Sequence, residues 1–141
     1  MSYKGSTMAT RRLFLLTMAL ILPITEPAHA RRGQLIHNVV DPMPPTVSNL
    51  SLDRLETLIV NGGGSHGWTF RRISLGHLEA TYTHKTHIAT VDIIFDKEIL
   101  RITYKASENL GHDGDLIHPH YNAWIQKLEQ NINLKLNAYT K

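Results

Sequence analysis

Hydrophobic residues recur at two different spacings along this chain, and each spacing predicts a different kind of element. Between residues 52 and 59, leucine and isoleucine recur at helical spacing. Ser51 stands where its hydroxyl can cap this helix, and Asp53 falls in the first turn, where a negative charge suits the helix dipole. Gly62–Gly64 lacks the preceding strand and the Gly-Lys-Ser/Thr ending of a phosphate-binding loop, so we expect this triplet to end the helix as a turn.

Four segments after the glycines alternate apolar and polar residues, which is typical of strands with one buried face. They run from Trp68 to Ser74 and over residues 78–83, 89–95 and 100–105. The connections between them are short, which favours antiparallel pairing in one sheet with a covered face and a wet face. On a regular strand, His84 and His87 would project to opposite faces, because their spacing is odd.

A last helix is predicted to begin at Pro119, a residue well suited to the first helical position, with His118 near the cap. It carries an apolar stripe formed by Tyr121, Trp124, Ile125, Leu128, Ile132 and Leu136. We therefore predict a single α+β domain over residues 48–138 with the element order α-β-β-β-β-α. Its antiparallel four-stranded sheet has both helices packed on one face.

The first thirty residues have the pattern of a secretory signal peptide. Arg11 and Arg12 precede a twelve-residue apolar run, and Ala28-His29-Ala30 offers a cleavage site after Ala30. A helix of that length spans about 18 Å, too short for a hydrocarbon core of about 30 Å, so we expect no stable membrane span after cleavage. The arginine pair fits general secretory or twin-arginine export, and either route predicts a periplasmic or secreted protein.

Composition and charge narrow the function classes. The chain contains no cysteine, which excludes disulfides, thiolate metal sites and a lipid-modified N-terminal cysteine. Residues 31–47 contain several prolines and little periodicity, and we predict an extended linker there. The formal net charge of +3 would fall to +1 on cleavage, because three basic residues and one acidic residue lie before Arg31. The remaining basic residues are not clustered, so we expect no nucleic-acid binding.

Histidine is the unusual count, with eight of nine residues after the predicted cleavage site. His112, Asp115, His118 and His120 lie close together in sequence and are suitable ligand types for zinc, copper or nickel, although no HExxH pattern occurs. A helix cap and solvated side chains explain the same residues without a metal. We therefore expect no bound cofactor and keep histidine-dependent metal binding as the alternative function.

A hydrolase is the second alternative. Ser107, Asp115 and His118 supply the residue types of a catalytic triad. The strained nucleophile motif G-x-S-x-G is absent, however. We therefore predict that the chain is not an enzyme.

Two motifs in the C-terminal half carry a family resemblance. Residues 102–110 (ITYKASENL) are followed by IHxxYNxWIxxL at residues 117–128, with Trp68 and His87 upstream. Through these motifs, residues 50–136 resemble a family of small uncharacterised envelope proteins of Gram-negative bacteria. The resemblance implies a compact domain and an exported location, but no reaction. Members often carry a cysteine after the signal; this chain has none, so we expect it not to be lipid-anchored.

Polar and aromatic residues of these motifs are predicted to serve structure. Ser107, Asn109, His118, Tyr121 and Asn122 should form a cluster where the 107–110 loop meets the last helix, with Asn122 hydrogen-bonded to that loop. The other structural residues of the motifs are Trp68, His87 and Trp124, and we expect Trp124 in the core.

The leading prediction is a binding or structural module of the cell envelope with an envelope protein as its partner. The wet face of the sheet or its edges would be the docking surface. Ile88, Ile94 and Ile99 fall on that face and would mark an interaction patch if they are exposed together. The identity of the partner and the oligomeric state stay open at this point.

Overall fold

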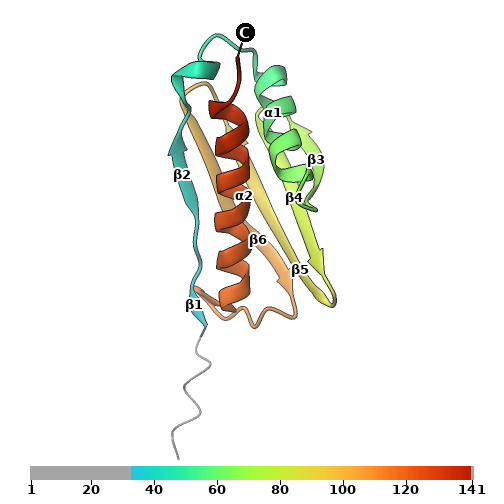
Figure 1. Cartoon of the computed structure of the whole chain (residues 1–141). Coiled ribbons are helices and arrows are strands. Elements are labelled where there is room, and N and C mark those ends of the chain that lie inside the picture. The colour runs from blue at the N-terminus through green and yellow to red at the C-terminus, as the bar shows by residue number, and fades with distance from the viewer. Residues whose placement is uncertain (1–32, 141) are drawn as a thin grey trace, which may run out of the picture.

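A five-stranded antiparallel sheet forms one layer of the protein, and two helices form a second layer on one of its faces (Figure 1). The structure is a computed structural model that describes residues 33–140. The predicted signal peptide and its cleavage site lie outside these residues. The helices are α1 (Leu52–Gly64) and α2 (Pro119–Asn137), with a short 3-10 helix η2 (Pro45–Val47) before α1. The sheet has the order β2-β6-β5-β4-β3, with β2 Val39–Pro42, β3 Thr69–Ser74, β4 His77–His84, β5 His87–Phe95 and β6 Ile99–Glu108.

The prediction of a single four-stranded sheet is wrong, although the α+β class holds. The four expected strands are β3 to β6, and β2 adds a fifth at the edge beside β6. A separate two-stranded sheet joins β1 (Gln34–Leu35) to β7 (Leu116–Ile117). Both β1 and β2 lie in the segment that we expected to be a linker. They are too short to show alternation of their own, and they exist because β7 and β6 offer free hydrogen-bonding edges.

The glycine triplet is the second correction, because it forms the last turn of α1 instead of a turn after it. Gly62 lies so close to α2 that an added Cβ would stand 2.9 Å from the Cα of Ile132. At Gly63 an added Cβ would stand 2.5 Å from a ring carbon of Phe70 and 2.8 Å from a methyl of Leu128. Two of the glycines therefore allow close approach of α1 to its neighbours, which a side chain would block.

The core between the layers contains residues that the helical spacing and the alternating spacing predicted to be buried. Alternate residues of β5, including Val91 and Ile93, are fully buried. The stripe on α2 is fully buried as well, except for Trp124, which is half-buried. The predicted caps are present: Ser51 Oγ accepts a hydrogen bond from the backbone N–H of Arg54 at 3.3 Å, and His118 is the N-cap of α2.

Candidate binding surface

The face of the sheet opposite the helices, called the outer face here, is not covered by any element among residues 33–140 (Figure 1). Successive side chains of a strand point to opposite faces, so the outer face carries the residues between the buried ones. Cross-strand register brings them into rows. The outer-face residues of the four long strands are Thr69, Arg71, Ser74, His77, Glu79, Thr81, Thr83, Ile88, Thr90, Asp92, Ile94, Ile99, Arg101, Thr103, Lys105, Ala106 and Glu108.

One of these rows, called the charged row here, consists of Arg71, Glu79 and Asp92, which His77 and Lys105 contact from neighbouring levels. Glu79 is bound from both sides, by Arg71 Nη2 at 2.9 Å and by Lys105 Nζ at 2.7 Å. Asp92 Oδ1 lies 2.7 Å from His77 Nε2 and 3.4 Å from Lys105 Nζ. These contacts link strands β3 to β6 and hold the charged side chains in defined positions.

These contacts change the proton affinity of Glu79 and Lys105. Hydrogen bonds from Lys105 and Arg71 lower the pKa of the Glu79 carboxyl below its ordinary value of 4.5. The hydrogen bond to Glu79, with the nearby charge of Asp92, raises the pKa of the Lys105 ammonium. Both groups therefore keep their charges over a wider pH range than they would in an unfolded chain.

A row of threonines lies next to the charged row. Register aligns Thr69, Thr81 and Thr90 across β3, β4 and β5, and Ala106 continues the row on β6. The hydroxyls of Thr81 and Thr90 lie 3.4 Å apart. The outer face therefore presents a line of hydroxyl groups beside a line of charges.

The three isoleucines that we expected to form one patch are divided between two ends of the outer face. Ile94 is 42% exposed and shares a row with Arg101, whose other neighbour is Val40 of β2, 62% exposed. Ile99 is partly exposed at the same end. Ile88 lies six residues from Ile94 along β5, or about 20 Å at the usual strand rise. Val40 and Ile94 are thus exposed apolar side chains on either side of Arg101, an arrangement that the alternation pattern of β5 alone does not reveal.

Two exposed charges at the ends of the outer face have no ion-pair partner among residues 33–140. Arg101 lies in the row of Ile94, and Glu108 lies in the row of Ile88 at the other end of β6. Arg101 has only a longer-range attraction to Asp96. Opposite charges are thus available at the two ends of one strand.

Aromatic rings extend from the core to the surface near the start of α2. The ring centroid of Tyr82 lies 5.3 Å from buried Trp68 and 5.0 Å from Trp124. Exposed His84 and His120 each lie 6.2 Å from Trp124. Trp124 therefore joins the core to the surface histidines.

His84 and His87 face each other across the β4–β5 hairpin, which corrects the expectation that they project to opposite faces. The chain reverses at Lys85 and Thr86, so the alternation rule for a single strand does not apply to them. Lys85 has φ 55°, a left-handed conformation that the tight turn requires.

The four metal candidates divide into two pairs. His112 stacks on Tyr104 with ring centroids 4.5 Å apart, and it lines a surface hollow together with Asp115. His118 and His120 have ring centroids 4.5 Å apart, and the backbone N–H of His120 donates to His118 Nδ1 at 3.2 Å. Within residues 33–140, no group of three or more histidine or acidic side chains could hold a metal ion.

Two of the five residues predicted to form a structural cluster, Ser107 and Tyr121, are connected through Tyr104. The hydroxyls of Tyr104 and Ser107 lie 3.1 Å apart, and Tyr104 packs edge-on against fully buried Tyr121 at 5.6 Å. Asn109 joins a different neighbour, since its Nδ2 donates to the carbonyl of Thr86 at 2.6 Å. The Ser107 hydroxyl is thus engaged by a tyrosine.

Asn122 binds the N-terminal strap, defined here as residues 34–43, instead of the 107–110 loop. Its Nδ2 donates to the Leu35 carbonyl at 2.8 Å, and its Oδ1 accepts from the backbone N–H of His37 at 2.9 Å. Asn122 is only 8% exposed, which strengthens these bonds by excluding water. The buried amide therefore ties the strap to α2.

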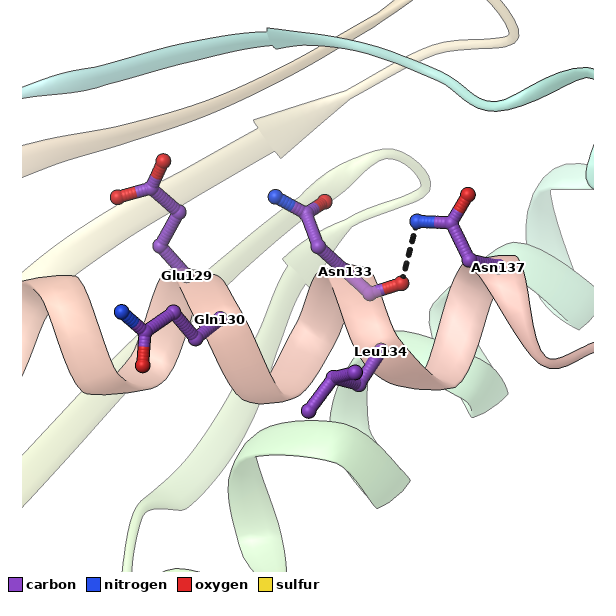
Figure 2. Close-up of a pocket in the computed structure, with 5 residues that line it drawn as sticks. All are labelled: Glu129, Gln130, Asn133, Leu134 and Asn137. Atoms are coloured by element: carbon purple, nitrogen blue, oxygen red, sulfur yellow. Dashed lines mark hydrogen bonds between the residues drawn. The ribbon is translucent and has the colours of Figure 1, made fainter.

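The surface hollow in Figure 2 lies along α2 and measures about 410 Å³. Glu129, Asn133 and Asn137 line it, and they also line an adjoining hollow of about 610 Å³ beside β2 and η2. Asn133 Nδ2 donates to Asp41 Oδ2 at 2.7 Å, and Glu129 Oε2 lies 3.4 Å from His37 Nε2. Two polar residues of these hollows, Asn133 and Glu129, thus contact the strap.

Sequence reasoning anticipated a wet sheet face but missed the charged row on it. Glu79, Asp92 and Lys105 stand at polar positions of three separate strands, and nothing local connects them. The signal that could have found the first two is register, since aligning β4 with β5 makes Glu79 and Asp92 neighbours. Lys105 joins them through the bulge in β6.

Comparisons of this chain with protein-family models, curated proteins and solved structures give no match. The resemblance to envelope proteins therefore stays a prediction. None of the helices in residues 33–140 is both long enough and apolar enough to cross a membrane.

Proposed function

We propose that this protein is a protein-binding module of the cell envelope and that the outer face of its sheet is the docking surface. The observation that carries the proposal is the charged row, held by four cross-strand contacts, beside exposed apolar side chains. Because these contacts already fix the charged side chains, a partner would meet a preorganised surface and lose less side-chain entropy on binding. The predicted signal peptide supports the envelope as the compartment.

The mixture of groups on the outer face suits protein recognition. Val40 and Ile94 supply exposed apolar area, which favours association through the hydrophobic effect. Charges and hydroxyls beside them supply orientation and specificity, because mismatched partners leave polar groups unpaired.

Site-specific photo-crosslinking in intact cells tests this proposal. A crosslinking residue in place of Thr90 samples the outer face, and the same residue in place of exposed Gln126 on α2 is the matched control. We expect the Thr90 position to yield one cross-linked protein of defined mass, identified by mass spectrometry, and the Gln126 position to yield none. Equal cross-linking from both positions, or none from Thr90, would overturn the proposal.

A further inference from the structure

We propose that the outer face binds a second copy of this chain, in a two-fold dimer whose axis crosses the strands at the level of Val91. This inference rests on the proposed docking surface and names its occupant. It follows from the register of the sheet, which makes the outer face complementary to itself when one copy is turned over and laid on the other.

The register defines the axis. At the level of Val91, its cross-strand neighbours are Ala80 and Tyr104, and all three point towards the helices. The charged row lies one residue to one side of this level and the threonine row one residue to the other side. The two-fold axis lies between two stacked sheets and runs across the strands at this level. It places each strand of one copy over the same strand of the other copy, in the antiparallel direction. Residues equidistant from the level then meet.

The two unpaired end charges become partners under this operation. Arg101 lies in the row three residues above Val91, and Glu108 lies in the row three residues below it. Each Arg101 therefore faces Glu108 of the second copy, and the symmetry produces this pair twice. Opposite charges placed across an interface fix register and favour the correct partner over others.

The inner rows are complementary as well. The charged row of one copy meets the threonine row of the other, so Asp92 faces Thr90 and Glu79 faces Thr81 across the interface. A carboxylate accepts hydrogen bonds and a threonine hydroxyl donates one, so each acidic residue meets a donor. The outermost rows bring Ile94 of one copy over Ile88 of the other, which pairs apolar with apolar surface.

Lys105 comes close to its own symmetry mate. It is the extra residue of the β6 bulge, at the level of the axis. Its ammonium is bound by Glu79 at 2.7 Å and by Asp92 at 3.4 Å within the same copy. These two carboxylates neutralise the charge locally, so the repulsion between the two lysines is reduced.

The size of the face indicates a weak but specific dimer. Strands β3 to β6, spaced about 4.8 Å apart, over about seven residues of 3.3 Å each, give about 440 Å² per copy. The total of about 900 Å² is below the range of stable complexes and typical of weak, transient ones. We therefore expect dissociation in the micromolar range and a molecular mass that depends on concentration.

Analytical ultracentrifugation of the purified exported protein tests the inference through charge reversal. We expect Arg101→Glu and Glu108→Arg each to weaken the dimer at least tenfold, because each places like charges opposite each other. An equimolar mixture of the two variants should dimerise again, since every contact in the mixed dimer is between opposite charges. Lys127→Glu, on the exposed side of α2, is the matched control and should dimerise as the wild type does.

Three results would overturn the dimer: a wild-type protein that is monomeric at every concentration, reversals without effect, or a mixture that stays monomeric. The mixture also separates loss of the interface from misfolding, because misfolded variants could not rescue each other. A monomeric wild type whose Thr90 position still cross-links a different protein would refute the second copy and leave the proposed docking function standing.

Discussion

Replacing Gly62 with alanine tests how closely α1 and α2 approach each other. The added Cβ would stand 2.9 Å from the Cα of Ile132 and 3.0 Å from the carbonyl oxygen of Asn131. Both neighbours are backbone atoms of α2, which cannot rotate away as a side chain can. Because carbon atoms in contact are normally about 3.5–4.0 Å apart, the two helices must separate by about 0.5–1 Å.

Two opposing terms set the magnitude of this change. Overpacking a well-packed contact costs about 1–3 kcal/mol, whereas alanine is about 1 kcal/mol more favourable than glycine inside a helix. The expected net loss in the free energy of unfolding is therefore between 0 and about 2 kcal/mol. For a domain of about 100 residues, the upper end corresponds to a fall in Tm of roughly 8–10 °C.

Gly64→Ala is the matched control, because nothing lies within 4 Å of its added Cβ. It gains the helix propensity without the clash, so its free energy of unfolding should rise by a few tenths of a kcal/mol to about 1 kcal/mol. Urea unfolding and calorimetry of both variants provide the measurement. If Gly62→Ala proved as stable as Gly64→Ala, the close contact between the helices would be refuted.

Three further substitutions test other parts of the structure. Tyr121→Phe should leave the free energy of unfolding unchanged or raise it by about 1 kcal/mol, because the buried hydroxyl has no hydrogen-bond partner among residues 33–140. A loss above about 1 kcal/mol in urea unfolding would show that the hydroxyl has such a partner. Asn122→Ala should lower the free energy of unfolding by about 2–3 kcal/mol and speed hydrogen exchange at the His37 amide, because the strap loses its buried hydrogen bonds to α2. Unchanged exchange at the His37 amide would contradict this role of Asn122. The stabilisation from Glu79, whose pKa is lowered on folding, is present above pH 4.5 and lost as the pH falls through the folded pKa. In denaturant titrations, Glu79→Gln should therefore lower the free energy of unfolding at neutral pH and flatten its dependence on acid; an unchanged acid dependence would contradict this.

The long elements were predictable because their burial follows a local period. In α2 the residues that face the sheet recur every three or four positions, and in β4 to β6 they recur every second position. Cap residues such as Ser51 and His118 likewise act within their own first turn. No knowledge of the rest of the chain is needed to find these features.

The short strands and the glycine triplet were mispredicted because their conformations depend on distant residues. Strand β2 has only four residues and is a strand because β6 pairs with it. A local rule predicts that a glycine triplet forms a turn. In the structure the triplet is helical, and α2 lies so close to Gly62 that only glycine fits there. His84 and His87 face each other because the chain reverses between them, which a spacing rule within one strand does not include.

The sequence by itself therefore determined which residues of each strand are apolar and which are polar, and hence that one face of the sheet would be wet. Only the tertiary structure decided which of those polar residues are neighbours. Register aligns Glu79 with Asp92 on neighbouring strands, and the β6 bulge places Lys105 within reach of both. Arg101 and Glu108 stand equidistant from Val91 for the same reason. Alternation is fixed by the backbone of a single strand, whereas register is fixed by hydrogen bonds between neighbouring strands and by the turns that join them.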